Sequence, residues 1–155
     1  MAIIGSLMKT DMVMVGPEAT VAEAARSMAQ NQVGAVLVVD GAVLRGILSE
    51  RDVASRIVAE GKDPAATKVS DVSTSDVVSV DVAVHIRECA QLLRDKGIRH
   101  LPVTENGKPV GILSSRDFLA YVVEGLEGLV DRARYKQALN EGDDPYDHLG
   151  GSYGD

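Results

Sequence analysis

A seven-residue stretch that contains a hydroxyl, a guanidinium group and a carboxylate occurs twice in the chain. It reads GILSERD from Gly46 to Asp52 and returns 65 positions later as GILSSRD from Gly111 to Asp117. In each copy an apolar run typical of a strand ends at Ser. The Asp three residues later opens a helical pattern, which predicts that Ser is a helix N-cap. Such a junction gathers a hydroxyl, a carboxylate and unpaired backbone N–H groups, a set suited to a sugar and a phosphate.

The same pattern also has a purely structural explanation. Ser-x-x-Asp is a variant of the capping box, in which the two side chains only satisfy the donors of the first helical turn. A cap requires neither the Arg before the Asp nor the Gly three residues before the Ser, yet both recur at identical spacing. The repetition therefore favours a repeated unit whose junction is a site, and capping remains the alternative.

The duplication extends well beyond these two stretches. Residues 7–54 align with residues 72–119 without a gap, and twelve of the 48 aligned pairs are identical. A repeat at a fixed offset indicates one supersecondary unit present twice. Each unit is too small and too apolar on its faces to be stable alone, so the two halves are expected to pack together.

Hydrophobic periodicity and turn residues predict the order β-α-β-β-α in each unit, and hence an α/β (α+β) fold. A short strand precedes a helix with apolar residues at i, i+3, i+4 and i+7, and a hairpin and a second helix follow. The first unit is predicted to have strands at 12–15, 35–39 and 43–48, a helix with its apolar face at Val21, Ala24, Ala25 and Met28, and a helix at 50–60 that Gly61 ends. The second is predicted to have strands at 77–80, 100–103 and 110–113, a helical face at Ile86, Cys89, Ala90 and Leu93, and a long helix at 115–140.

These elements predict five regions along the chain. The first unit spans residues 5–61, a linker 62–68, the second unit 69–124, an extension of the last helix 125–140, and an acidic tail 141–155. The tail holds five acids and no Lys or Arg, so that the first 140 residues carry a net charge of −2 out of −7. Its Gly- and Asp-rich composition predicts disorder.

Composition excludes several classes of function. No apolar run is long enough to cross a bilayer, and the N-terminus lacks the pattern of a signal peptide, so we expect a cytoplasmic protein with no membrane partner. Without a basic stripe, binding to a nucleic-acid backbone is not expected. The lone Cys89 is predicted to be a buried structural thiol, and His85 and His148 have no companions at ligand spacing, so no metal site is expected.

The paired units resemble a known family. Two tandem β-α-β-β-α units that each end in GILSxRD, the second with GIRHLPV from Gly97 to Val103, are similar to a pair of CBS domains, or Bateman module, over about residues 5–120. The resemblance implies two units packed sheet to sheet about a pseudo two-fold axis. It also implies a non-catalytic sensor that binds AMP, ADP or ATP, or alternatively NAD or S-adenosylmethionine. The sensor is expected to be a homodimer that signals to a partner protein in trans.

The resemblance further implies two clefts, each formed by both repeats. Carried over residue by residue, the first cleft joins Ser114, Arg116 and Asp117 to Ala19, Thr20, Val33, Gly34 and Ala35. The second joins Ser49, Arg51 and Asp52 to Val84, His85, Ile98, Arg99 and His100.

Elementary chemistry supports this kind of ligand. A carboxylate accepts hydrogen bonds from the two ribose hydroxyls, and an adjacent Arg neutralises phosphate. Small residues such as Gly34 and Ala35 leave room for adenine, whereas Arg99 and His100 crowd the other cleft, so Asp117 marks the favoured adenine site. Arg99 and His100 are expected either to reach phosphate or to be satisfied structurally by Glu105 or a second subunit.

No nucleophile with a neighbouring base and no phosphate-binding loop is visible, so an enzyme is not expected. One alternative is an NAD-type sensor of redox state whose ligand is a dinucleotide that spans the groove. Another is a ligand-free scaffold in which the junctions are only caps and the last helix recruits a partner. That helix carries an apolar stripe that is expected either to reinforce a homodimer or to fold onto the chain's own core, at Leu119, Val122, Val123, Leu126, Leu129, Val130 and Ala133.

Overall fold

The computed structural model describes residues 2–141, and the acidic tail predicted to be disordered lies almost entirely outside them. The chain divides into a compact unit of residues 1–117 and a second unit that begins at Phe118. Both predicted β-sheets belong to the first of these units, and most of the long C-terminal helix belongs to the second.

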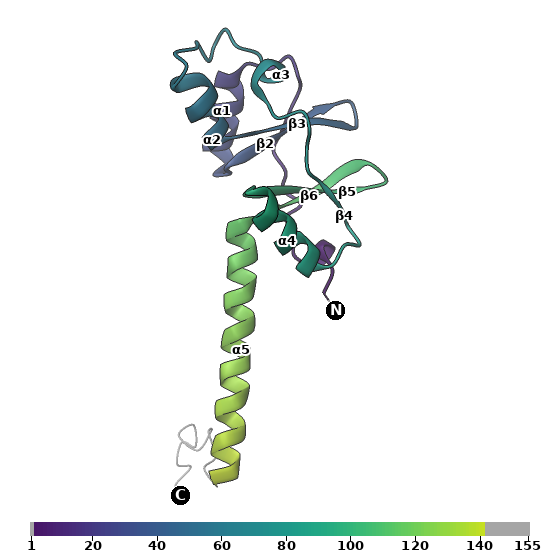
Figure 1. Ribbon diagram of the computed structural model, residues 1–155, viewed down its shortest axis with the longest axis vertical. Coiled ribbons are helices and arrows are strands. Elements are labelled where there is room, and N and C mark those ends of the chain that lie inside the picture. The colour runs from purple at the N-terminus through teal and green to yellow at the C-terminus, as the bar shows by residue number, and fades with distance from the viewer. Residues whose placement is uncertain (1, 142–155) are drawn as a thin grey trace, which may run out of the picture. The chain divides into compact units, whose positions relative to one another are not determined.

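Two three-stranded sheets form the framework of the first unit (Figure 1). In each sheet the first strand runs parallel to the second, and the second and third form an antiparallel hairpin. The first sheet contains β1 (Met14–Val15), β2 (Ala35–Asp40) and β3 (Val43–Ser49), and the second contains β4 (Val80–Asp81), β5 (His100–Glu105) and β6 (Lys108–Ser114). The mixed α/β fold predicted from the repeat is confirmed.

The two hairpins have the same register at the 65-residue offset. Ala35 pairs with Ser49 in the first sheet, and His100 pairs with Ser114 in the second. A register shift follows at the fourth residue of β2 and of β5. Because the register is the same, each repeated Ser is held beside the first residue of the neighbouring strand. Ser49 thus lies next to the segment 33–35, and Ser114 lies next to the segment 98–100.

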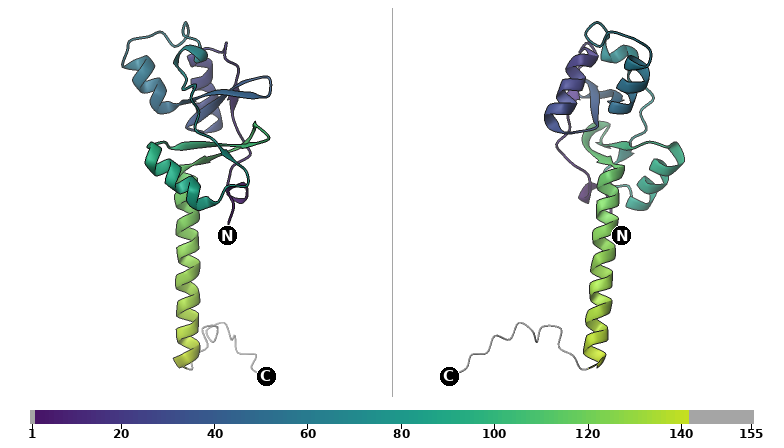
Figure 2. Two further views of the ribbon diagram at one scale, coloured as in Figure 1. Left: turned by 45° about the vertical axis from the view of Figure 1, so that its right-hand side comes forward. Right: turned by 90° about the vertical axis from the view of Figure 1, so that its left-hand side faces the viewer.

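Each repeat has an amphipathic helix between its first and second strands, and this helix buries its apolar face (Figure 2). The first, α1 (Val21–Asn31), begins with a capping box between Thr20 and Glu23. Its predicted apolar face packs on the first sheet, where Val21 and Ala24 are fully buried among β2 and β3 residues. The second, α4 (Ile86–Lys96), buries Ile86, Cys89 and Leu93. In both helices the i, i+3, i+7 positions of the predicted face are buried, as amphipathic periodicity requires.

The segment that opens each repeat packs on the other repeat. Before β1, the turn η1 (Ile4–Ser6) is bound to the second half by a hydrogen bond from Ile4 N to Val84 O at 2.8 Å. Before β4, the short helix α3 (Val69–Val72) is bound to the first half by a hydrogen bond from Val69 N to Ala19 O at 2.8 Å. This exchange of segments ties the two halves into one body.

The repeated Gly46 and Gly111 lie where these exchanged segments cross the hairpins. A Cβ on Gly46 would lie 2.9 Å from Oγ of Ser73 and 3.1 Å from the carbonyl oxygen of Thr74. A Cβ on Gly111 would collide with the side chain of Met8. Both glycines are therefore required by close backbone approach, which explains why the repeat preserves them.

The second helix of each repeat begins at the Ser junction. In the first repeat α2 (Glu50–Val53) continues as a π-helical turn, η2 (Ala54–Val58), so the α-helical part is shorter than the predicted 50–60. Gly61 ends the segment with a φ of +65°, as the predicted C′ position requires. In the second repeat α5 (Ser115–Glu141) is one helix of 27 residues, close to the predicted extent.

No helix within residues 2–141 is long and apolar enough to cross a membrane.

Candidate functional site

Two pockets lie in the unit of residues 1–117, one at each Ser–Asp junction. The Asp52 pocket has a volume of about 410 Å³, and the Asp117 pocket has a volume of about 360 Å³. The Asp52 pocket is lined by Gly34, Ile47, Ser49, Glu50, Arg51, Asp52, Ser55, Arg56, Thr74, Asp76, Val77, Val78, Gly97, Ile98, Arg99 and His100. The Asp117 pocket is lined by Lys9, Asp11, Met12, Val13, Gln32, Val33, Gly34, Ala35, Leu37, Glu50, Arg99, His100, Ile112, Ser114, Ser115, Arg116 and Asp117.

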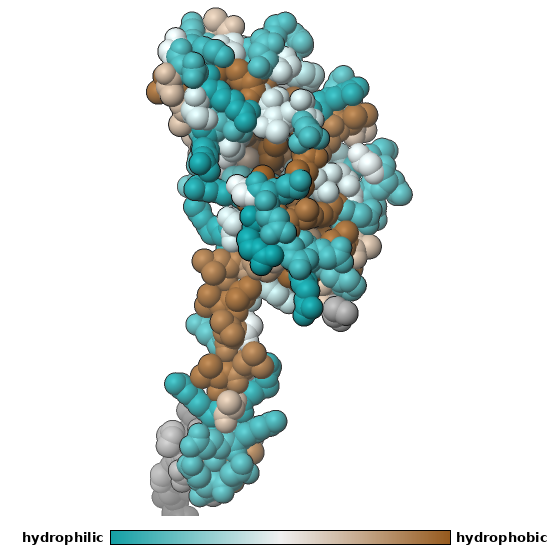
Figure 3. Space-filling model, in the orientation of Figure 1, coloured by the Kyte–Doolittle hydropathy of each residue, from teal (hydrophilic) through white to brown (hydrophobic). Residues whose placement is uncertain are grey.

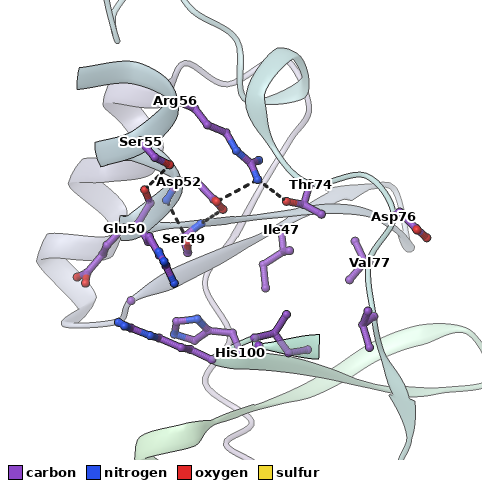
Figure 4. Close-up of a pocket in the computed structure, with 16 residues that line it drawn as sticks. Ile47, Ser49, Glu50, Asp52, Ser55, Arg56, Thr74, Asp76, Val77 and His100 are labelled. Atoms are coloured by element: carbon purple, nitrogen blue, oxygen red, sulfur yellow. Dashed lines mark hydrogen bonds and ion pairs between the residues drawn. The ribbon is translucent and has the colours of Figure 1, made fainter. Parts of the chain in front are cut away.

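In the Asp52 pocket the junction forms a complete capping box (Figure 4). The backbone N–H of Asp52 donates to Oγ of Ser49 at 3.2 Å, and the backbone N–H of Ser49 donates to Oδ2 of Asp52 at 2.9 Å. Ser49 and Asp52 therefore do cap the helix, as the structural explanation of the repeat predicted. Oδ1 of Asp52 remains available for a further partner.

That partner is Arg56, which lies in the π-helical turn η2 directly after α2. Its guanidinium ion-pairs with Oδ1 of Asp52 at 3.2 Å. It also donates to Oγ1 of Thr74 at 3.1 Å (Figure 4) and to the carbonyl oxygen of Val72 at 2.7 Å, both on the exchanged segment. Three simultaneous partners hold Arg56 in place, so that both oxygens of Asp52 are engaged by well-anchored groups.

The Asp117 pocket has the same junction with a different cation. The backbone N–H of Asp117 donates to Oγ of Ser114 at 3.1 Å, and the Ser114 hydroxyl donates to Oδ2 of Asp117 at 2.6 Å. Oδ1 of Asp117 pairs with Nζ of Lys9 at 2.8 Å. The Lys9 side chain is 66% exposed and the Asp117 side chain only 18% exposed. The carboxylate is therefore enclosed, whereas its cationic partner is in solvent.

The charge of Asp117 reflects these contacts. Burial alone would raise the pKa of the Asp117 carboxyl, but the hydrogen-bonded ion pair with Lys9 and the hydrogen bonds from Ser114 outweigh it. The pKa therefore lies below the ordinary value of an aspartate, and the group is an anion at neutral pH.

A common wall separates the two pockets, because Gly34, Glu50, Arg99 and His100 line both. The His100 imidazole lies against Gly34, where a Cβ would approach Nε2 to 3.1 Å. Burial lowers the pKa of His100, the negative charge of Glu50 opposes that shift, and Arg99 adds to it. A neutral imidazole and a guanidinium from the second repeat thus stand between the two junctions.

The structure brings together most of the residues expected in each cleft. The Asp117 pocket combines Ser114, Arg116 and Asp117 with the segment 33–35 of the other repeat. The Asp52 pocket combines Ser49, Arg51 and Asp52 with the segment 98–100. Each pocket is therefore built from both repeats.

Four residues expected in the clefts do not line either pocket, namely Ala19, Thr20, Val84 and His85. Thr20 caps α1, and Ala19 and Val84 accept hydrogen bonds from the exchanged segments. His85 forms a β-bridge with Ile3, and its buried Nδ1 has no hydrogen-bond partner in the described part of the chain. The backbone at these positions forms contacts that hold the two halves together.

In their place the pockets are lined by the segments just before β1 and β4. Asp11, Met12 and Val13 line one pocket, and Asp76, Val77 and Val78 line the other. Met12, Val13, Val77 and Val78 were predicted to belong to strands, but the strands begin later, at Met14 and Val80. The sequence did contain a signal for these lining residues, because Asp11 and Val13 recur as Asp76 and Val78 at the 65-residue offset.

Within residues 2–141, no group of three or more His, Cys, Asp or Glu side chains is placed to hold a metal ion. The chemistry of the two pockets is that of hydroxyl, carboxylate, guanidinium and ammonium groups beside an apolar lining.

Known proteins share both repeats. The family model for the CBS domain matches residues 4–59 and 69–124, more than half of the chain, and both Ser–Asp junctions fall within the matches. The chain belongs to the CBS-domain family. A CBS domain-containing protein of Bacillus subtilis, YhcV, is 37% identical over 117 residues, which cover 76% of this chain and 83% of that protein. Four longer relatives from Arabidopsis thaliana match over 20–23% of their own length.

Solved structures show the same architecture. The CBS domain protein PAE2072 of Pyrobaculum aerophilum, which was solved in complex with AMP, is 29% identical, with a TM-score of 0.70 over 75% of this chain and 89% of that one. The hexameric CBS-CP12 protein from bloom-forming cyanobacteria has a TM-score of 0.70 over 90% of this chain and 88% of that one. At 23% identity this second similarity is one of fold alone.

Proposed function

We propose that this protein is a non-catalytic regulator that binds an adenine nucleotide, AMP, ADP or ATP, in the Asp117 pocket. The observation that carries the proposal is the pairing of the enclosed Asp117 carboxylate with an exposed Lys9 ammonium at 2.8 Å. A carboxylate whose cationic partner lies in solvent can exchange that partner for ribose hydroxyls. The AMP complex of the related Pyrobaculum protein supports nucleotide binding by this type of module.

The lining of the pocket suits each part of a nucleotide. Asp117 would accept hydrogen bonds from the two ribose hydroxyls, and this pairing favours ribose over deoxyribose. The displaced Lys9, together with Arg99 and Arg116, would neutralise the phosphate. Adenine would occupy the apolar part of the pocket, which is lined by Met12, Val13, Val33, Ala35, Leu37 and Ile112.

Regulation would follow from the composition of the pocket. Because its lining comes from both repeats, a ligand that binds one arrangement of the repeats better than another shifts the equilibrium between them. The proposed readout is a change in the surface offered to a partner protein in trans. We propose further that the protein acts in the cytoplasm as a homodimer.

The test is a thermal-shift panel of AMP, ADP, ATP, NAD, NADH and S-adenosylmethionine on the wild type and Asp117→Ala. A ligand at about 100 times its dissociation constant adds roughly 2.7 kcal/mol of stability, which is a rise of about 5–10 °C for a chain of this size. We expect an adenine nucleotide to raise the wild-type transition and to leave that of Asp117→Ala unchanged. If no member of the panel moves the wild-type transition, the junctions are caps only and the proposal fails.

A second candidate is a dinucleotide that spans both pockets, and the common wall favours it. Arg99 and His100 line both pockets, so a pyrophosphate placed there would have its adenosine arm in one pocket and its second nucleoside arm in the other. In that case NAD would give the largest shift of the panel, and Asp52→Ala would reduce it as much as Asp117→Ala.

A further inference from the structure

Glu50 is the position at which the two repeated seven-residue stretches differ, because the second copy has Ser115 there. Acids are common on protein surfaces, and hydrophilic residues cover much of the face of the compact unit that Figure 3 shows. Glu50 is distinguished by its place, since it lines the Asp52 pocket as well as the Asp117 pocket. Among the described residues it is therefore the acid that the two pockets share.

Backbone contacts fix Glu50 at the common wall. Its N–H donates to the carbonyl oxygen of Gly34 at 2.9 Å. A Cβ on Gly34 would lie 3.7 Å from Oε2 of Glu50 and 3.1 Å from Nε2 of His100, so the carboxylate and the imidazole lie beside the same glycine. Figure 4 shows the Glu50 side chain directed away from Arg56 and Thr74. The carboxylate is thus held next to the wall and apart from the cation that pairs with the neighbouring junction.

The Glu50 carboxylate contributes no contact to the fold. Within residues 2–141 its side chain makes no hydrogen bond or ion pair, and the capping box of α2 is formed by Ser49 and Asp52 instead. Glu50 is also exposed, so its negative charge faces whatever enters either pocket. Because this charge has no structural partner to neutralise it, its effect is expected on a ligand.

The charges around the Asp117 pocket are balanced. With His100 neutral, the described residues that line the pocket include three cations and three acids, namely Lys9, Arg99 and Arg116 against Asp11, Glu50 and Asp117. A phosphate that binds there makes the pocket and its ligand together net negative, and each additional phosphate adds to the repulsion. A pocket with this balance of charges disfavours the more highly charged ligand.

We propose that Glu50 makes the Asp117 pocket select a nucleoside monophosphate over the corresponding triphosphate. The cations of the pocket meet the first phosphate, whereas further phosphates extend along the common wall and approach the Glu50 carboxylate. Like charges repel, so the penalty rises with the number of phosphates. The same charge opposes a pyrophosphate placed on the wall. This inference rests on the proposed function and names which adenine nucleotide the pocket prefers.

Isothermal titration calorimetry with adenosine, AMP and ATP, at low ionic strength and without divalent cations, tests the inference on the wild type, Glu50→Gln and Glu50→Asp. We expect Glu50→Gln to raise the affinity for ATP by about 10-fold and that for AMP by about 3-fold, because the Coulomb energy scales with the charge of the ligand. The affinity for adenosine should not change. Glu50→Asp keeps the charge and should keep the wild-type preference for AMP. Added salt should reduce the gain in Glu50→Gln, since it screens the repulsion.

Glu88→Gln is the matched control, because Glu88 lies in the first turn of α4, lines neither pocket and carries the same charge. It should leave the ratio of the AMP and ATP affinities unchanged. The inference is overturned if the wild type binds ATP more tightly than AMP, if the ratio is the same in Glu50→Gln, or if it changes equally in Glu88→Gln. In each of these cases a nucleotide still binds, so the proposed function stands. If neither the wild type nor Glu50→Gln binds any of the three ligands, both proposals fail.

Discussion

The two Ser–Asp junctions share a local structure but differ in the cation that meets the carboxylate. Asp52 is paired with Arg56 from its own helix, and Arg56 is anchored by two further hydrogen bonds to the exchanged segment. Asp117 is paired with Lys9, which comes from the segment exchanged from the other end of the chain and is largely in solvent. The duplication preserved the cap and changed its neutralising partner.

Alignment of the two repeats at the 65-residue offset shows that neither cation has a counterpart in the other repeat. The position equivalent to Arg56 in the second repeat is Tyr121, and the position equivalent to Lys9 is Thr74. Thr74 assists Arg56 in one pocket, whereas Lys9 acts directly in the other. An anchored guanidinium blocks a carboxylate oxygen, but an exposed ammonium can release it, so the two pockets are expected to bind ligand unequally.

The largest expected effect is on nucleotide affinity at the two carboxylates. Asp117→Ala should weaken binding by about 100-fold, because hydrogen bonds to a charged group contribute about 1.5–3 kcal/mol each. Asp52→Ala should change affinity by less than about 3-fold. Isothermal titration calorimetry of the best ligand from the panel measures both. Equal losses in the two variants would remove the distinction between the pockets.

Arg56→Ala should change both stability and stoichiometry. Loss of its hydrogen bonds to Val72, Thr74 and Asp52 is expected to cost about 2–3 kcal/mol of unfolding free energy, measured by urea denaturation. The freed Asp52 oxygen should let the second pocket bind, raising the calorimetric stoichiometry from one nucleotide per chain toward two. Lys9→Ala is the control: it should lower affinity by about 10-fold without a second site, because an ammonium near phosphate is lost. A stoichiometry of one in Arg56→Ala contradicts this account.

Arg99→Ala tests the common wall. Where the first repeat has Gly34 the second has Arg99, so one guanidinium serves two pockets. We expect about a 10-fold loss of affinity for ATP, since charge-assisted hydrogen bonds are about twice as strong as neutral ones, and a smaller loss for adenosine. An equal loss for adenosine and ATP would show that Arg99 shapes the wall without meeting phosphate.

The smallest expected effect is the pH dependence of stability at His100. Its pKa in the folded chain is lowered, so the unfolded chain binds the proton more readily. The contribution of His100 to the free energy of unfolding is therefore fully present above about pH 6.5, the ordinary pKa of histidine in an unfolded chain. It is lost as the pH falls below that pKa. The facing charges of Glu50, Asp52 and Asp117 oppose this loss and Arg99 adds to it. Urea denaturation between pH 7.5 and 5 should show a steeper decline for the wild type than for His100→Gln, and parallel curves would contradict the assignment.

Much of the fold was predictable because its signals are local. The helical face of α1 follows from apolar spacing, and the N-cap roles of Ser49 and Ser114 follow from residues three apart. The prediction that segments 33–35 and 98–100 lie near the opposite junctions came from the family resemblance, and the structure places them there. Thr20 and His85 were also expected in the clefts through the resemblance, but the structure places them outside the two pocket linings, as the N-cap residues of α1 and α4.

The sequence by itself determined the duplicated elements, the caps and the stripe of α5, because each depends on residues within a few positions of one another. Only the tertiary structure decided that Lys9 meets Asp117, that Arg56 reaches Val72 and that residues 11–13 line a pocket. The physical reason is the exchange of segments across Gly46 and Gly111. It joins residues from opposite ends of the chain, and no local spacing records such a contact.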